Sequence, residues 1–482
     1  MAKVLFLQNL WYEYVGVMVI SGCLKHAGHQ TMVVVGDSMA EFEPIIRREK
    51  PDIIAFSLMS GLHLWANDVV GKIRALDLPQ RPYIIYGGPH PTFFPDILTK
   101  ADIDAVCVGE GEFPMVDLAN AIDRGERPTD IANLHVKDAG GVIHRNPVRV
   151  LGSLDEQPFP DRDIYYRYDF FRTYPTKSFM TGRGCPYDCT FCYNKTIRDI
   201  YDDKGKFVRM RSPEHVIEEI LDVKKKYGMR TVYFFDDTFG IQKGWARTFL
   251  KIYKERVGLP FLCRVRANTT NEEFIAALKD AGCVTVSFAI ETANEELREK
   301  VLRKKITDKH IHQTAALLRK YGIKFFTYNM VGIPEQSMDD VFDTIRLNIE
   351  IGTSYPWCSI FHPYPGTELA QYCIEKGYLA ADFDPDHLAT SFHSSATIND
   401  GLCNAAEITN VHKLFQLAVY CPPLLPLVRW MSRRKPNFLF SLVFMGVYFI
   451  NFVRSEQLDL KSAFLLAYRN VGLMLGRKRK PA

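Results

Sequence analysis

The chain has 482 residues, of which 47% are hydrophobic and 24% charged, so a disordered or fibrous polypeptide is excluded and two or three globular domains are expected. Its formal net charge of +4 is unevenly divided. Residues 419–482 hold 11 Lys/Arg against 2 Asp/Glu, a local +9 that leaves −5 for the first 418 residues. Eight of the 11 cysteines are scattered singly, which indicates reduced thiols in the cytoplasm and argues against a disulfide framework. We expect no secretory leader, because the strand-like run Val4–Leu7 comes at once.

The first part of the chain alternates between short apolar runs, typical of buried strands, and longer stretches with helical periodicity. This alternation predicts an α/β domain, a doubly wound parallel sheet of the Rossmann-like kind with helices on both faces. The expected strands are Val4–Gln8, Thr31–Val35, Ile53–Ser57, Tyr83–Tyr86 and Ala105–Val108, and the expected helices are Val17–Ala27, Glu41–Glu49 and Trp65–Leu76.

Polar and glycine-rich loops follow the ends of these strands. Ligands of open parallel sheets bind beyond the carboxyl ends of the strands, and glycine allows close approach of the backbone. His90 has an ordinary alternative, because a histidine beside proline in a turn is commonly solvated or packed on its loop. The candidate binding residues are Ser57, Gly87, Gly88, His90, Gly109, Glu110 and Gly111.

The domain boundaries follow from composition. The stretch 124–170 is rich in Asp, Gly, Arg and Pro and indicates a bridge between domains. Within it, Gly140-Gly141 favours a short hairpin. We therefore expect a first domain at residues 1–135, a linker at 136–175, a second domain at 176–383 and a helical C-terminal region at 384–482.

Three cysteines then occur at the spacing Cys-x3-Cys-x2-Cys, namely Cys185, Cys189 and Cys192. A [4Fe–4S] cube takes one ligand per iron, so a loop with three thiolates leaves the fourth iron free to bind another molecule. The alternatives are a structural zinc loop or three ordinary core cysteines. Zinc is disfavoured because no second cysteine knuckle lies nearby.

From about Ser178 the alternation of strands and helices resumes and predicts six βα units, which suggest a partial (β/α)6 barrel of the TIM type. The expected strands are Ser178–Thr181, Thr231–Phe235, Phe261–Val265, Thr285–Ala289, Phe325–Met330 and Trp357–Phe361. The expected helices are Pro213–Tyr227, Trp245–Glu255, Asn271–Ala281, Glu295–Val301, Asp308–Tyr321 and Met338–Ile351.

Barrel chemistry gathers where strands end, so the polar residues at these ends are candidates for the site. Arg266 and Glu291 have a structural alternative, an ion pair with each other. His362 and Tyr364 are the candidate catalytic residues, and their alternative is closure of the barrel edge. The candidates for cofactor binding are Asp236, Asp237, Arg266, Glu291, Gly332 and Pro334.

The cysteine loop with its Gly-Arg-Gly lead-in, the Asp-Asp strand end, the Gly-Ile-Pro loop and the segment Pro363–Glu368 together resemble the radical S-adenosylmethionine (SAM) superfamily. The first domain, with Gly-Gly-Pro-His-Pro-Thr and Gly-Glu-Gly-Glu at its strand ends, resembles the cobalamin-binding domain of one branch of that superfamily. The branch's cobalt-ligating pattern Asp-x-His-x-x-Gly is absent. In the Gly-Ile-Pro loop, Glu335 stands for the usual glycine and Gln336 for the usual glutamate.

The resemblance implies that the three cysteines hold a [4Fe–4S] cluster, which cleaves SAM to methionine and a 5′-deoxyadenosyl radical. It further implies that the six strand-end candidates bind SAM and that the loops of the first domain bind cobalamin. The expected reaction is cobalamin-dependent methylation of an unactivated carbon. The alternatives are oxidative ring formation without methyl transfer and a non-catalytic cobalamin or iron–sulfur sensor.

The C-terminal region holds two apolar runs, Leu414–Trp430 and Phe438–Val453, separated by Arg433-Arg434-Lys435. The second run has no charged residue but is shorter than the roughly 20 residues of a membrane-spanning helix. We expect peripheral contact with the inner face of the membrane through 414–482, or else a buried helix that caps the barrel. The expected partners are a small, hydrophobic or lipid-like substrate and an electron donor such as flavodoxin or ferredoxin. No nucleic acid is expected.

Overall fold

The computed structural model describes residues 1–388, 400–455 and 464. The chain divides into two compact units, Met1–Thr173 with Ile197–Phe207, and Tyr174–Thr196 with Val208–Ala482. The second unit thus begins before the cysteine loop, and the chain returns to the first unit after it. The domain boundaries expected from composition stay a prediction.

The first unit contains a seven-stranded sheet in the order β2-β1-β3-β4-β5-β6-β7. Its first five strands are parallel and agree with the expected ones to within two residues at each end. They read as apolar runs because both faces of the sheet are covered. The strands are β1 (Lys3–Gln8), β2 (Gln30–Val35), β3 (Ile53–Ser57), β4 (Tyr83–Gly87), β5 (Ala105–Cys107), β6 (Leu134–Lys137) and β7 (Ile143–Arg145).

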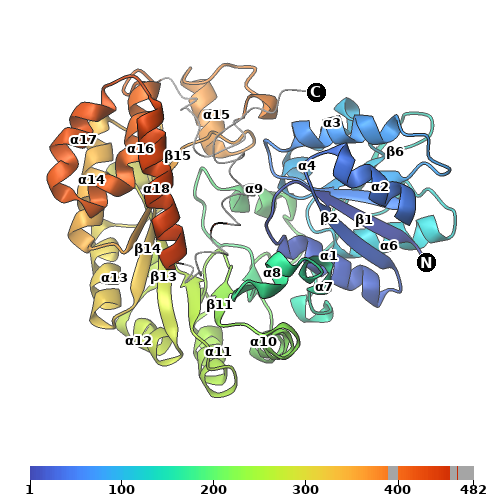
Figure 1. Ribbon diagram of the computed structural model, residues 1–482, viewed down its shortest axis with the longest axis horizontal. Helices are drawn as coiled ribbons and strands as arrows, with labels where there is room; N and C mark the ends of the chain where they lie inside the picture. Colours follow the sequence, from blue (N-terminus) through green and yellow to red (C-terminus); the bar gives the residue numbers. More distant parts are fainter. Residues whose placement is uncertain (389–399, 456–463, 465–482) are drawn as a thin grey trace. The chain divides into compact units, whose positions relative to one another are not determined.

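Helices cover both faces of this sheet, as Figure 1 shows for α2 and α3 against α1 and α6. The helix α2 begins at a capping box, in which Ser38 and Glu41 satisfy each other's backbone N–H groups. The helices are α1 (Val15–His26), α2 (Met39–Glu49), α3 (His63–Arg74), α4 (Pro89–Phe93), α5 (Ile97–Lys100), α6 (Glu112–Asp123), α7 (Asp163–Tyr166) and α8 (Asp169–Thr173). The doubly wound fold is confirmed.

The hairpin expected at Gly140-Gly141 is also confirmed, since β6 and β7 are antiparallel. The pair does not stand apart in the linker, however. β6 pairs with β5 and so extends the sheet of the first unit. Apolar residues of β6, such as Leu134 and Val136, are buried there.

The second unit contains six parallel strands in the order β15-β14-β13-β12-β11-β8, a partial barrel as expected. The first strand begins two residues earlier than expected because the charge of Lys177, which is fully buried, hides it in the sequence. The strands are β8 (Thr176–Phe179), β11 (Thr231–Phe234), β12 (Phe261–Arg264), β13 (Cys283–Glu291), β14 (Lys324–Val331) and β15 (Tyr355–Ile360), with a separate two-stranded ribbon of β9 (Gly182–Arg183) and β10 (Arg209–Met210).

Helices surround the barrel strands and bury one large apolar core. The helix expected at Glu295–Val301 is present, but its residues Leu297–Val301 form a π-helical turn, in which the fully buried Arg298 donates to the carbonyls of Thr292 and Ile306. The helices are α9 (Tyr193–Ile200), α10 (Pro213–Tyr227), α11 (Lys243–Arg256), α12 (Glu272–Asp280), α13 (Asp308–Lys320), α14 (Met338–Ile351) and α15 (Glu368–Glu375).

The C-terminal region forms α16 (Ala405–Tyr420), α17 (Leu425–Ser432) and α18 (Phe438–Ser455), drawn in orange to red in Figure 1. The start of the first apolar run is protein core, because Leu414 and Phe415 pack with α14 and β15. Within the described ranges, no helix combines the length and hydropathy needed to cross a bilayer. The closing basic run Arg477–Lys480 lies outside the described residues.

Candidate functional site

The cysteine loop joins β9 to α9 without regular structure at residues 184–189. It is fixed at its far end by Thr190, whose N–H and hydroxyl donate to the carbonyls of Leu302 (3.1 Å) and Val301 (2.7 Å). A turn follows, in which the N–H of Cys192 donates to the carbonyl of Cys189 at 3.1 Å. These anchors hold three thiols on one short, braced segment.

Two side chains donate toward the sulfur atoms. Arg266, two residues after β12, places Nη1 3.6 Å from Sγ of Cys189, and Asn194 places Nδ2 3.7 Å from Sγ of Cys192. The Arg266 guanidinium also lies 3.8 Å over the ring of Tyr187 within the loop. Such donors stabilise thiolate ligands and the charge of an iron–sulfur cluster.

Burial keeps the thiols of Cys185 and Cys192 protonated before iron binds. Burial raises the pKa of Cys185, and burial raises the pKa of Cys192 to about 11. Coordination to iron removes the proton. No three His, Cys, Asp or Glu side chains of the described residues converge as the ligands of a single metal ion would. A cube with one thiolate per iron needs no such convergence, so this donor set fits a [4Fe–4S] cluster.

Asp236, which follows β11, anchors the other end of the loop. Its Oδ1 accepts from the N–H of Thr181 (2.9 Å), the hydroxyl of Thr181 (2.7 Å) and the N–H of Gly182 (2.8 Å). Its Oδ2 is buried and has no partner within the described part of the chain. Burial raises the pKa of Asp236 to about 6. The expected role in SAM binding stays a prediction, and the structure adds a role in bracing the loop. The neighbouring Asp237 is exposed.

The expected alternative of an ion pair between Arg266 and Glu291 is wrong. Glu291 pairs with Lys304, whose Nζ lies 2.6 Å from Oε1, and both side chains are buried. Arg266 turns to the cysteine loop instead, and its Nε and Nη2 have no partner among the described residues. Buried, unpartnered donors on Arg266 and an unpartnered Oδ2 on Asp236 fit a charged ligand such as the amino-acid end of SAM.

The Gly-Ile-Pro loop is held by hydrogen bonds of the two residues that depart from the family pattern, Glu335 and Gln336. The buried Gln336 accepts from the N–H of Gly332 at 2.9 Å and donates to the hydroxyl of Thr292 at 3.2 Å. Glu335 takes the left-handed conformation, with φ at 64°, which a glycine would adopt without strain. Its N–H donates to Asp400 at 2.9 Å and its carboxylate accepts from Tyr372. Pro334, which lies between Gly332 and Glu335 in the loop, is buried.

The candidate catalytic residues follow β15. His362 is buried, and Tyr364 is partly buried with its ring 5.4 Å from that of Tyr193, the first residue of α9. Tyr193 in turn donates to the carbonyl of Pro365 at 3.3 Å. The structure therefore brings Tyr364 next to the end of the cysteine loop, within the second unit. Its catalytic role stays a prediction.

The candidates of the first unit share one edge of its sheet. Ser57 and Gly87 end β3 and β4, the third loop follows β5, and these three neighbouring strands are parallel. Gly88 has φ at 89°, and a Cβ there would meet the backbone N of Leu58 at 2.8 Å, so its glycine serves packing inside the loop. Six of the seven remain partly exposed at this edge, where a cofactor can approach: Ser57, Gly87, Gly88, Gly109, Glu110 and Gly111.

Tyr201 is a residue of this edge that the sequence did not reveal. It lies in the segment Ile197–Phe207, and its hydroxyl accepts from the N–H of Glu110 at 2.6 Å and from Nδ2 of Asn133 at 3.3 Å. A Cβ at Gly109 would meet this hydroxyl at 2.1 Å. The glycine therefore makes room for Tyr201, which lies 92 residues further along the chain, and no local pattern signals such a contact.

His90 is not a solvated turn residue. It is buried and stacked on His63, with ring centroids 4.0 Å apart, and its Nδ1 lies 3.2 Å from Oγ of Ser60. Burial lowers the pKa of His90 from 6.5 to about 3, so the imidazole is neutral at physiological pH. A neutral ring can act as a ligand, and the expected role in cobalamin binding stays a prediction.

This pKa predicts a pH dependence of stability. A histidine whose pKa falls on folding contributes stability that is present above pH 6.5 and is lost as the pH falls toward 3. At pH 5 the loss is about 2 kcal/mol, or about 5 °C in melting temperature. In a His90→Asn variant the difference in melting temperature between pH 7 and pH 5 should shrink by that amount. The exposed His26, changed in the same way, is the control. An equal shrinkage in both variants would refute the assignment.

Comparisons with known proteins agree with this architecture. Residues 11–119 match the B12 binding domain, and residues 179–347 match the radical SAM superfamily. An uncharacterized methyltransferase of Pyrococcus horikoshii is 31% identical over 71% of this chain and 73% of its own length. A cytidylyl-2-hydroxyethylphosphonate methyltransferase of Streptomyces wedmorensis is 22% identical over 80% of this chain and 78% of its own length. An anaerobic magnesium-protoporphyrin IX monomethyl ester cyclase of Rubrivivax gelatinosus is 23% identical over 88% of this chain and 76% of its own length.

Two solved structures share the fold. The cobalamin-dependent SAM radical enzyme OxsB, with aqua-cobalamin and SAM bound, superposes with a TM-score of 0.68 at 15% identity, over 100% of this chain and 76% of its own. The second structure is the radical SAM methyltransferase TsrM of Kitasatospora setae, with tryptophan and a SAM analogue bound. It superposes with a TM-score of 0.63 at 17% identity, over 78% of this chain and 77% of its own.

A barrel with a three-cysteine loop and a doubly wound sheet with an open carboxyl edge define a radical enzyme with two cofactor-binding units. The chain belongs to the radical SAM superfamily, in the branch that carries a B12-binding domain. Its cofactors are a [4Fe–4S] cluster, SAM and cobalamin.

Proposed function

We propose that this enzyme methylates an unactivated carbon of a hydrophobic or lipid-like small molecule, using cobalamin. The observation that carries the proposal is the presence in one chain of the braced three-cysteine loop and the B12-binding sheet. The most similar relative named above, at 31% identity, is described as a methyltransferase. The cluster with SAM supplies a 5′-deoxyadenosyl radical, and cobalamin supplies the methyl donor.

The residues of this chain bind and orient these groups. In the proposal, Cys185, Cys189 and Cys192 bind the cluster, and Asp236 and Arg266 present their buried, unpartnered polar atoms to SAM. Lys304 holds the carboxylate of Glu291 in one orientation, which favours directed hydrogen bonding to a hydroxyl of the ligand. The further candidates keep their predicted roles: Asp237, Gly332 and Pro334 toward SAM, and Ser57, Gly87, Gly88, His90, Gly109, Glu110 and Gly111 toward cobalamin.

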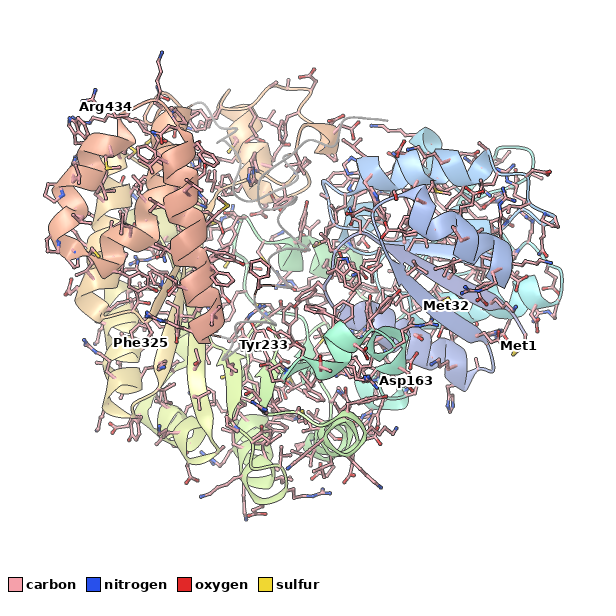
Figure 2. The ribbon with its side chains drawn as sticks, viewed as in Figure 1. Met1, Met32, Asp163, Tyr233, Phe325 and Arg434 are labelled. Carbon is pink, nitrogen blue, oxygen red and sulfur yellow. The ribbon has the colours of Figure 1, made fainter. Side chains whose placement is uncertain are left out.

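The inner face of the barrel sheet supports a hydrophobic substrate. The relatives act on chemically different molecules by their names, so the substrate class rests on this chain's own side chains. Alternate residues of the strands pack outward in the helix-covered core, as Phe234 and Phe325 do. The residues between them that are only partly buried include five aromatic side chains: Tyr233 (labelled in Figure 2), Phe235, Phe326, Tyr328 and Trp357. Aromatic surfaces bind apolar bodies and rings.

Ring formation without methyl transfer is the second candidate. It is favoured by the relative in Rubrivivax gelatinosus, which is named a cyclase and matches 88% of this chain. Both reactions begin with the same radical, so the fate of the SAM methyl group separates them.

The test is an anaerobic incubation of the reconstituted enzyme with SAM labelled in its methyl group and an apolar extract. Methylation predicts a product that carries the label and is heavier by a CH2 unit. Deoxyadenosine formed together with an unlabelled product that has lost hydrogen would overturn methyl transfer in favour of ring formation or oxidation.

We also propose the partners that this chemistry needs. A low-potential protein such as flavodoxin or ferredoxin reduces the cluster, and the region 414–482 brings the enzyme to the inner face of the membrane, where a lipid-like substrate is found.

A further inference from the structure

The connection between α17 and α18 forms an exposed corner in which a run of three basic side chains is flanked by apolar ones. We name the α17–α18 corner for six residues: Trp430, Arg433, Arg434, Lys435, Phe438 and Leu439. The three apolar side chains are among the most exposed large hydrophobics of the described residues, at 55% for Trp430, 69% for Phe438 and 61% for Leu439. The three basic side chains are exposed as well. Figure 2 labels Arg434 at the outer end of these helices.

The corner is held in place by the protein. The buried side chain of Asn410 in α16 donates Nδ2 to the carbonyls of Ser432 (3.0 Å) and Arg434 (2.5 Å). The guanidinium of Arg434 lies 4.1 Å over the ring of Trp430. These bonds fix the backbone between the two helices, so the aromatic and the basic side chains are presented together.

The apolar surface continues along α18. One face of this helix packs against the protein, with Phe440 buried, Asn451 bonded to Gln416 at 3.2 Å and the ring of Tyr448 5.5 Å from that of Trp357. Residues at four-residue spacing share the opposite face, and they are exposed and uncharged: Phe438, Leu442, Gly446 and Ile450. A continuous exposed apolar surface of this kind marks an interaction site.

The positive charge of the α17–α18 corner indicates which kind of partner can bind there. Residues 408–455 contain six Lys/Arg and no Asp/Glu. Of the six, Arg429 pairs with Asp339 of α14, whereas Arg433, Arg434 and Lys435 face outward together. Two copies of this corner would repel each other. The segment 456–482 ends in Arg477–Lys480 and is basic as well. An anionic surface matches all of these charges.

We infer that the α17–α18 corner and the exposed face of α18 dock on an anionic lipid bilayer. Trp430, Phe438 and Leu439 enter the headgroup region, where aromatic side chains are favoured, and the three basic side chains bind lipid phosphates. The helix lies along the surface in the manner of interfacial amphipathic helices. This inference rests on the proposed membrane contact and names its surface and lipid chemistry, but it does not depend on methyl transfer.

The test is co-sedimentation of the full-length holoenzyme with vesicles of mixed phosphatidylglycerol and phosphatidylcholine, and with vesicles of phosphatidylcholine alone. Binding should require the anionic lipid and weaken as salt rises. The triple variant R433E/R434E/K435E should bind the anionic vesicles about a hundredfold more weakly. A second variant, Phe438→Ser with Leu439→Ser, should also bind more weakly, with little change in salt dependence.

The matched control is R247E/K251E/K254E on α11, which changes the net charge equally at exposed positions of the barrel. It should bind the vesicles like the natural chain. Equal losses in the control and in the corner variant would overturn the proposal, as would equal binding to both kinds of vesicle. A corner variant that binds normally but changes from dimer to monomer would assign the surface to a second copy instead.

Deoxyadenosine formation without vesicles separates this inference from the proposed function. The corner variants should cleave SAM like the natural chain, since the corner is no part of the cofactor site. A loss of vesicle binding with full SAM cleavage supports the docking surface whatever the reaction is. Variants that lose SAM cleavage as well would show a corner coupled to the active site and would refute a pure docking role.

Discussion

A Cys189→Ala variant should assemble no intact [4Fe–4S] cluster and should form deoxyadenosine from SAM at least about a thousandfold more slowly, equivalent to about 4 kcal/mol of barrier. Cys189 is the most buried of the three cysteines and the one that receives Nη1 of Arg266. With two thiolates the loop leaves two irons without a protein ligand. The measurements are iron and sulfide content after anaerobic reconstitution, and deoxyadenosine by chromatography.

Cys421→Ala is the matched control. This cysteine follows α16, is partly buried, and lies outside the cysteine loop. Its variant should reconstitute normally and cleave SAM at the natural rate. Normal iron content in the Cys189 variant would remove this residue from the ligand set.

The second large effect is expected at Asp236. An Asp236→Ala change leaves two N–H groups and a hydroxyl of Thr181 and Gly182 without their acceptor in a buried place. Each unsatisfied donor costs about 1–3 kcal/mol, so the free energy of unfolding of the apoprotein should fall by about 3–5 kcal/mol. The lead-in to the cysteine loop loosens, and iron content after reconstitution should fall with it. Thermal unfolding and iron analysis give both readouts.

Asp236→Asn separates the structural role from the predicted role toward SAM. The amide oxygen can still accept from Thr181 and Gly182, so the stability and the iron content should recover. If Asp236 also binds SAM through its charge, SAM cleavage stays low in this variant. The exposed Asp237, changed to Ala, should leave the stability nearly unchanged. An Asp236→Ala variant with natural stability and iron content would contradict the bracing role.

The course of the sheets could be predicted because their strands are buried on both faces. Ile53–Ser57 reads as an uninterrupted apolar run, and β3 has the expected bounds. The prediction is less accurate where a buried residue is charged or a helix is interrupted. Lys177 in β8 is fully buried, and so is Arg298 in the π-helical turn after β13. Sequence patterns assume that charged residues lie outside, and both residues break that assumption.

The partners of the site residues could not be predicted in the same way. The ends of the strands locate Arg266 and Glu291, but nothing in a linear pattern tells that Glu291 pairs with Lys304 rather than with Arg266. The sequence likewise gives no sign that the hydroxyl of Tyr201 accepts from the N–H of Glu110, or that Asn410 donates to the carbonyl of Arg434 in the α17–α18 corner. Each of these contacts joins segments brought together only by the tertiary fold.

Cobalamin retained by the purified protein would show that the first unit binds the methyl donor. The full-length chain is reconstituted anaerobically with iron, sulfide and cobalamin, desalted, and examined by its visible spectrum. We expect stoichiometric cobalamin to stay with the protein alongside an intact cluster, because residues 11–119 match the B12 binding domain. An intact cluster with no retained cobalamin would contradict the account and leave a radical SAM enzyme without a methyl donor.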